Sequence, residues 1–285
     1  MERINFKHSV IFFNICILIS PLYFLLNFEP IILCLFLILI LGISHGALDN
    51  IKGKKLLKLF GYKSIIIFYI IYILISLLII IFWLIFPNIV LFIFLIVAAY
   101  HFGKEDTVFS FNRNFLISEC LFFLKGSSVV ITPLLLQREA TNEIFKILNF
   151  NIFESTVFSD QFLIILLFLS FLSSLYISNK KNTDIKGIMI MDFLSLLILN
   201  FFLTPILAFT LYFCFLHSIR HSITLIFELD KSFKLGIKKF ISKAVPLTLI
   251  TAVIFLFAIY FLNNFYVLDE AIYKVIFIGL ASLTF

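Results

Sequence analysis

The sequence predicts an all-α integral membrane protein, a polytopic bundle of about ten transmembrane helices, within a range of eight to ten. Of its 285 residues, 62% are hydrophobic and only 13% are charged, and the mean hydropathy is +1.16. Soluble domains of this size do not have that composition. Apolar runs recur along the chain, and no segment alternates polar and apolar residues as a membrane β-strand does.

The apolar runs give the expected helices in chain order. About 20 helical residues cross a hydrocarbon core of about 30 Å, and runs near this length follow one another throughout. Only Pro87 and its neighbour separate the third run from the fourth, and only Pro205 and its neighbour separate the seventh from the eighth. Each of these pairs could therefore change the number of expected helices by one. The expected helices are residues 9–26, 30–49, 64–86, 88–103, 114–136, 161–178, 185–203, 205–228, 244–262 and 271–285. Together they form a single transmembrane domain over residues 1–285.

The basic residues set the orientation of these helices, because Lys and Arg accumulate in the cytoplasmic loops of membrane proteins. If the N-terminus is cytoplasmic, 17 of the 22 Lys and Arg residues lie on the cytoplasmic side, and three lie in the opposite loops. The cytoplasmic segments are then 1–8, 50–63, 104–113, 179–186 and 229–243. This bias predicts a cytoplasmic N-terminus and explains the net charge of +6 without a nucleic-acid partner.

Four of the five histidines fall near the cytoplasmic ends of expected helices. His45 lies in GISHGALD (42–49), His101 in HFGKED (101–106), and His217 and His221 in LYFCFLHSIRHS (211–222). Ionisable side chains in or near hydrocarbon are costly and usually mark a site. His217 and His221 are one helical turn apart, a spacing that lets two imidazoles bind one metal ion. The pattern predicts a metal site shared by the four histidines.

The residues alone leave the metal open between iron and zinc. Imidazole suits iron, copper and zinc, whereas the four cysteines lie in apolar runs without the paired spacing of ligands, which disfavours copper(I) and iron–sulfur clusters. A bound histidine generally donates its second ring nitrogen to a carboxylate or a carbonyl. The candidate partners in the same cytoplasmic layer are Asp49, Asp106 and Glu228, and Asp49 would share a helix face with His45 in the expected helix 30–49.

Two of these polar residues have alternative interpretations. Asp106 can equally be a solvated loop carboxylate beside Lys104. The guanidinium of Arg220 does not coordinate metals while protonated, so Arg220 is expected to pair with one of the candidate carboxylates or to extend to the membrane interface.

Taken together, the clusters resemble a known family, the Brp/Blh-type membrane β-carotene 15,15′-dioxygenases, which are found beside microbial rhodopsins. The blocks GISHGALD, AAYHFGKED, LYFCFLHSIRHS and GLASLTF follow one another in the family's order and cover nearly the whole chain.

The resemblance implies an iron(II) enzyme of the cell (inner) membrane that cleaves the central double bond of β-carotene with O2 to give two molecules of all-trans-retinal. It also implies that His45, His101, His217 and His221 are the catalytic iron ligands. Retinal could then pass through the lipid bilayer to a microbial rhodopsin.

The chain departs from the family pattern at two points. After a stretch like GLASLTF the family continues into a Pro-His step, whereas this chain stops at Phe285, so we expect it to lack its C-terminal end. Lys125 stands where the family is expected to have arginine. Lysine cannot fill a role that needs the two parallel N–H donors of a guanidinium.

Two further classes compete with the enzyme. A divalent metal-ion transporter would use the same His/Asp cluster, but transport sites lie near the bilayer midplane at broken helices and repeats. A membrane haem protein would need axial histidines that face each other across a porphyrin.

Overall fold

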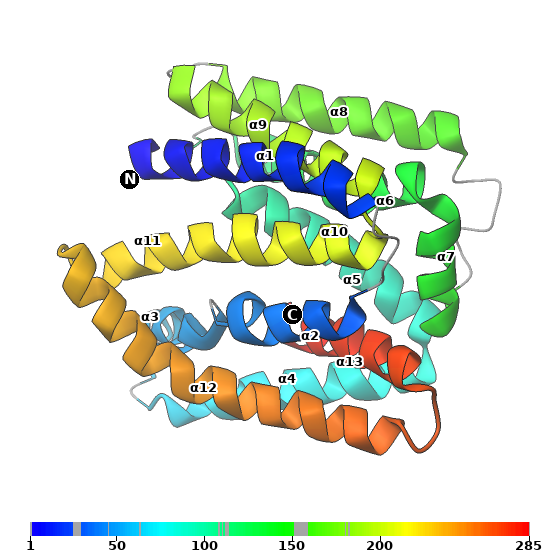
Figure 1. Cartoon of the computed structure of the whole chain (residues 1–285). Coiled ribbons are helices and arrows are strands. Elements are labelled where there is room, and N and C mark those ends of the chain that lie inside the picture. The colour runs from blue at the N-terminus through cyan, green and yellow to red at the C-terminus, as the bar shows by residue number, and fades with distance from the viewer. Residues whose placement is uncertain are drawn as a thin grey trace.

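Every regular element in the described part of the chain is helical (Figure 1). The structure is a computed structural model that describes residues 2–24, 30–44, 46–62, 64–107, 109, 111, 114–150, 159–179, 181 and 183–284. The α-helices are α1 Glu2–Phe24, α2 Ile31–Leu37, α3 Asp49–Leu59, α4 Ile66–Ile85, α5 Pro87–Glu105, α6 Phe115–Leu136, α7 Arg138–Ile147, α8 Asp160–Ser178, α9 Thr183–Phe202, α10 Pro205–Leu211, α11 Ile219–Leu229, α12 Phe233–Leu262 and α13 Leu268–Thr284. Two π-helical segments, η1 Ile38–Gly42 and η5 Tyr212–Ser218, and a 3-10 turn, η2 Gly46–Leu48, complete them.

Within the described residues, eight helical segments are long and apolar enough to cross a membrane. They are α1, α4, α5, α6, α8, α9, the combined segment Pro205–Leu229 and α12. Ile31–Gly42 is a shorter apolar helix, and α13 has 17 residues. The predicted polytopic helical membrane fold is therefore confirmed, at the lower end of the predicted range.

Several predicted boundaries are wrong, and the errors have physical causes. α1 begins at Glu2 rather than at residue 9, and α12 begins at Phe233 rather than at 244, because polar and basic residues can continue a helix beyond the hydrocarbon. The 30 residues of α12 would extend about 45 Å at about 1.5 Å per residue. α3 and α7 fall in stretches that were expected to be loops.

The expected helix 30–49 is interrupted. The helical segment that starts at Ile31 ends at Gly42, a turn follows at Ile43 and Ser44, and α3 begins at Asp49. The prediction that one continuous helix carries both GISH and Asp49 is therefore wrong.

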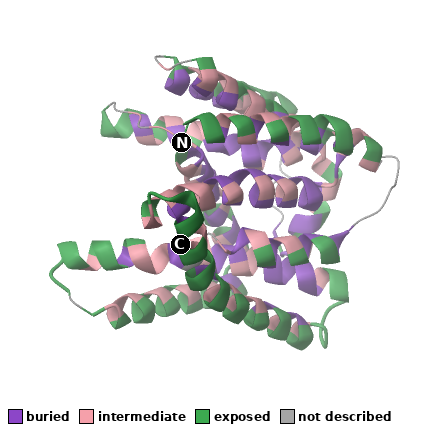
Figure 2. Cartoon of the chain, turned by 60° about the vertical axis from the view of Figure 1, so that its left-hand side comes forward, coloured by how far each residue is buried: buried purple, intermediate pink, exposed green. Residues whose placement is uncertain are grey.

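The segment α10–η5–α11 runs through the middle of the bundle (Figure 1) and is the most buried of the eight spans. By contrast, α4 and α12 lie at the periphery and bury the smallest shares of their residues, in keeping with the exposed outer helices in Figure 2. These two outer helices would therefore face lipid.

The closest helix pair is α5 with α6. A Cβ atom added at Gly103 would lie 1.8 Å from the backbone oxygen of Phe122, and one at Gly126 would lie 1.9 Å from the backbone oxygen of Ala99. Small residues allow membrane helices to approach in this way. The packing fixes the end of α5 that carries His101.

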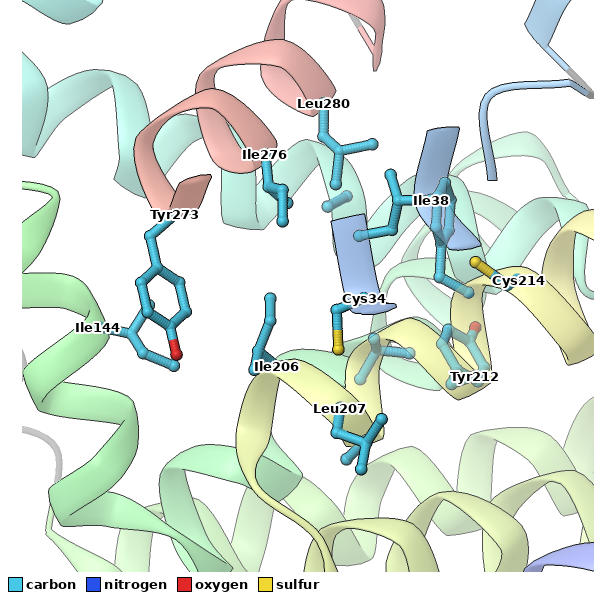
Figure 3. Close-up of a cluster of buried hydrophobic side chains, with 14 of the residues drawn as sticks. Cys34, Ile38, Ile144, Ile206, Leu207, Tyr212, Cys214, Tyr273, Ile276 and Leu280 are labelled. Atoms are coloured by element: carbon cyan, nitrogen blue, oxygen red, sulfur yellow. The ribbon is translucent and has the colours of Figure 1, made fainter. Parts of the chain in front are cut away.

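An apolar cluster joins the centre of the bundle to α13 (Figure 3). It brings Cys34 and Ile38 together with Ile206 and Leu207 of α10 and with Ile276 of α13. These side chains are almost fully buried. The cluster therefore holds the start of the α10–η5–α11 segment in place against α2 and the C-terminal helix.

Candidate active site

Three of the four predicted ligand histidines lie close together. The ring centroids of His101 and His217 are 5.3 Å apart, and those of His217 and His221 are 6.5 Å apart with nearly parallel rings. His101 lies near the end of α5, and His221 lies in α11. The prediction that His217 lies near the end of its helix is wrong, because η5 carries it about half-way along the span Pro205–Leu229. His45 lies outside the described residues, but its neighbours Ile43 and Gly46 line the same cavity as His101 and His221.

The π-helical segments explain how this region is shaped locally. A π-helical turn inserts an extra residue into a helix and occurs frequently at functional sites. η5 contains His217, and η1 ends three residues before His45. The two segments touch, since a Cβ atom at Gly42 would lie only 2.5 Å from the ring of Phe213, and the Ser218 hydroxyl donates to the Gly42 carbonyl over 3.4 Å.

His217 is held by a buried carboxylate. Its Nδ1 atom lies 2.8 Å from Oδ1 of Asp106, and the Tyr212 hydroxyl donates to Oδ2 of the same residue over 2.5 Å. Burial alone would raise the pKa of the Asp106 carboxyl, but the attraction of His217 and its hydrogen bond hold that pKa below its usual value. An ionised carboxylate only accepts, so His217 donates from Nδ1, and its Nε2 atom faces the opposite side of the ring.

His221 has the same arrangement with a different partner. Its Nδ1 atom lies 3.0 Å from Oε2 of Glu105, and Lys52 Nζ lies 3.9 Å from the other oxygen of Glu105. Glu105 was not among the predicted partners. The available signal was its position in HFGKED, four residues after His101 and therefore on the same face of α5.

The other two predicted carboxylates differ in whether they reach the cavity beside His101 and His221. Asp49 lines the cavity beside His221, and burial raises the pKa of its carboxyl to about 6. Glu228 is exposed, one residue before the end of α11.

Arg220 does not pair with any of the three candidate carboxylates. Its NH1 and NH2 atoms lie 2.6 and 3.0 Å from the two carboxylate oxygens of Asp192 on α9, and NH2 also donates to Ser9 Oγ of α1 over 2.8 Å. This buried fork therefore ties α11 to α9 and α1.

Replacing Asp192 with asparagine should lower the free energy of unfolding by about 3–5 kcal/mol, because the charge of Arg220 would remain buried without its counterion. Denaturation of the detergent-solubilised protein would measure the loss. Asp184→Asn at the start of the same helix is the matched control and should change stability by less than about 1 kcal/mol. Equal stability of the two variants would show that the buried pair is not a stabilising contact.

A cavity of about 310 Å³ lies beside His101 and His221, which line it together with Asp49 and Glu105. His217 does not line the cavity, but its ring contacts that of His101. Aromatic and aliphatic side chains form most of the remaining wall: Phe68, Tyr69, Tyr72, Phe94, Phe102, Phe209, Phe213, Leu247, Ile250, Leu280 and Leu283. Such a cavity suits an apolar ligand that is oriented by a few polar groups.

Residues of two outer helices line the cavity and also reach the outer surface of the bundle. Tyr69 of α4 and Ile250 of α12 both line it and are also exposed on the outside of the bundle. Since α4 and α12 do not pack closely against each other, a molecule dissolved in the hydrocarbon could enter between them.

The geometry does not by itself identify a metal. Among the described residues, no group of three or more His, Cys, Asp or Glu side chains is arranged so that it could hold a metal ion as it stands. The donor set nonetheless has the chemistry of a metal site, because two imidazoles are each oriented through Nδ1 by a carboxylate, as bound histidines commonly are.

Two comparisons with known proteins give the same description. A family model described as Beta-carotene 15,15′-dioxygenase matches residues 36–285. The chain is similar to a protein named Beta-carotene 15,15′-dioxygenase from an uncultured marine bacterium, 66A03, with 28% identity over 255 residues that cover 87% of this chain and 88% of the relative. No solved structure matches.

Proposed function

This chain belongs to the β-carotene 15,15′-dioxygenase family and is a carotenoid-cleaving dioxygenase, and we propose that it performs the cleavage at an iron(II) ion held by His45, His101, His217 and His221. The substrate would be β-carotene, which is cut at its central 15,15′ double bond. One O2 would supply both carbonyl oxygens, so that two molecules of retinal form. The enzyme would act in the cell (inner) membrane.

The observation that carries the proposal is the pair His101 and His221, which line an apolar cavity, with the His217 ring in contact with both. Asp106 and Glu105 each accept from Nδ1 of a histidine, which leaves Nε2 of each ring as the nitrogen that would bind a metal. When bound, iron(II) would supply the activation of O2. The redox requirement favours iron over zinc, which has no redox chemistry.

The protein's own side chains would position the substrate and exclude water. The aromatic wall fits an apolar polyene, which would arrive from the bilayer through an opening between α4 and α12. The same opening would return retinal to the lipid, from which a microbial rhodopsin could take it. Divalent-metal transport, the alternative function, has no support from the family match.

Expression in a bacterial host that accumulates β-carotene tests the activity. We expect carotene to disappear from the extracted lipids and retinal to appear in twice the molar amount, with the host that carries an empty vector as control. Unchanged carotene, with the protein present in the membrane and iron supplied, would contradict the proposal.

Replacing Asp106 with asparagine should weaken iron binding by about 10–100-fold, the usual effect of losing a group that orients a metal ligand. The asparagine side chain is neutral, so it would accept a weaker hydrogen bond from His217 Nδ1 than the Asp106 carboxylate does. Competition with a coloured iron chelator would measure the affinity of the purified protein.

The matched control for Asp106→Asn is Glu119→Gln, since Glu119 pairs with Tyr100 and Lys104 and does not line the cavity. It should bind iron as the unaltered protein does. Wild-type affinity in Asp106→Asn would remove Asp106 from the site.

A further inference from the structure

We propose that α3 is an interfacial helix that binds anionic phospholipids at the membrane surface. Three apolar side chains of this helix would lie among the acyl chains, and three lysines would lie against the phosphates of the headgroups. This role goes beyond the proposed function and does not depend on it, because the helix surface concerned lies outside the set of histidines.

The apolar side of α3 is exposed. It consists of Leu56, Leu59 and Phe60, whose exposed fractions are 55%, 83% and 71%. Spacings of three and four residues place these side chains on one side of a helix. Because they are not buried against the protein, another apolar partner has to cover them.

The lysines of α3 lie on its opposite side. Lys54, Lys55 and Lys58 are exposed, and their spacings of three and four residues again define one helix face. Leu56 and Lys58 are two positions apart, which is about 160° around a helix of 3.6 residues per turn. A helix at a membrane surface needs such an arrangement, with one face toward the acyl chains and the other toward the headgroups.

Contacts with α4 place α3 level with the membrane boundary. Asn50 donates from its side-chain amide to the Tyr69 hydroxyl over 2.9 Å, and a Cβ atom added to Gly53 would lie 2.2 Å from the ring of Phe68. Phe68 and Tyr69 belong to the first turn of α4, where a candidate membrane span begins. In Figure 1, α3 lies at the same end of the bundle as the N-terminus, which is the end predicted to be cytoplasmic.

An anionic phospholipid matches both faces of α3, because it carries a negative phosphate next to its acyl chains. Lysine suits this position, since its long stem can lie along apolar surface while its ammonium group reaches the headgroup layer. Each lysine near an anionic membrane surface strengthens binding by about fivefold. An acidic soluble protein would match the lysines but would leave Leu59 and Phe60 uncovered at the membrane boundary.

The first turns of α12 carry a similar charge without this separation of faces. Lys234 and Lys238 are exposed there, and Ile241 is 51% exposed. Lys234 and Ile241 are seven residues apart and therefore share one side of the helix. Since no apolar face lies opposite its lysines, the beginning of α12 offers a charge-matched control for α3.

The proposed lipid site adjoins the cavity beside His101 and His221. Asn50 and Lys52 of α3 line that cavity, and Lys52 Nζ lies 3.9 Å from Oε1 of Glu105. Lipid bound to α3 would therefore hold in place a helix that forms one edge of the cavity.

Lipid binding by the detergent-purified protein tests the basic face. Native mass spectrometry would count the lipid molecules retained in titrations with phosphatidylglycerol and with phosphatidylcholine. We expect the unaltered protein to prefer phosphatidylglycerol, and we expect a triple variant to bind it about tenfold or more weakly. This variant carries Lys54→Gln, Lys55→Gln and Lys58→Gln.

The matched control removes the same charge from α12, with Lys234→Gln, Lys238→Gln and Lys243→Gln. It should weaken phosphatidylglycerol binding by less than about threefold. An equal loss in the two triple variants, or an unaltered protein that binds both lipids equally, would overturn lipid binding by the lysines of α3.

A fluorophore on the apolar face tests where that face lies. Leu59→Cys would be labelled in a Cys120→Ser protein, because Cys120 is exposed and the other three cysteines are buried. In bilayers of phosphatidylcholine and phosphatidylglycerol, lipids brominated on their acyl chains should quench this label strongly. They should also quench a label at Val253→Cys, on the exposed side of α12, and quench one at Lys55→Cys much less. Equally weak quenching at positions 59 and 55 would place both faces of α3 in water, as a soluble partner requires, and would overturn the proposal.

Discussion

Replacing His217 with alanine should abolish the cleavage of β-carotene and reduce iron binding by more than about 100-fold, since losing even a partner of a ligand typically costs about 10–100-fold. His217 is 1% exposed and its ring contacts those of both His101 and His221, so its imidazole would be the central ligand of the set. The protein should still insert into the membrane, because the hydrophobic spans are unchanged. Retinal formation and bound iron, measured on the purified variant, check both parts.

The fifth histidine is the control for this experiment. His8 on α1 pairs with the carbonyl of Phe215 over 2.8 Å and takes no part in the ring contacts that join His101, His217 and His221. His8→Ala should keep iron and activity. A His217→Ala protein that retains full activity would remove His217 from the ligand set.

Replacing Gly126 with alanine should cost more than about 3 kcal/mol of folding free energy, beyond the usual range for an overpacked site. The new methyl group would lie 1.9 Å from the carbonyl oxygen of Ala99, so α5 and α6 must separate rather than rotate a side chain. Because α5 carries His101 and leads into Asp106, activity should fall with stability. Thermal denaturation in detergent and retinal formation measure the two effects.

Gly187→Ala is a matched change at a less constrained position. There the nearest atom would be Cε2 of the Phe6 ring at 3.1 Å, and the ring can shift. This variant should lose less than about 1 kcal/mol. If Gly126→Ala is as stable as Gly187→Ala, the close contact between α5 and α6 is not a requirement of the fold.

The fold class was predictable because it depends on apolar runs that are read directly from the sequence. Most spans were placed within a few residues. The early starts of α1 and α12 were missed because charged residues mark the end of the hydrocarbon, not the end of a helix. α7 was missed because its residues, such as Arg138 and Lys146, resemble those of a polar loop.

The residues of the candidate site could be predicted from the sequence better than the contacts between them. The spacing of His217 and His221 predicted their proximity, and both His101 and Asp106 adjoin His217. No local pattern could pair His221 with Glu105 or Arg220 with Asp192, because those contacts join residues of different helices. The π-helical segments and the break after Gly42 lie where η1 and η5 are in contact, and that contact joins parts of the chain that are distant in sequence. The ligand assignments remain predictions.

Metal reconstitution of the purified protein tests the central claim most directly. The protein would be stripped of metal, loaded under anaerobic conditions with iron(II), with zinc(II) or with no metal, and then given β-carotene and O2. We predict retinal only in the iron-loaded sample. Equal retinal formation with zinc or without metal would contradict an iron-dependent cleavage at the histidine cluster.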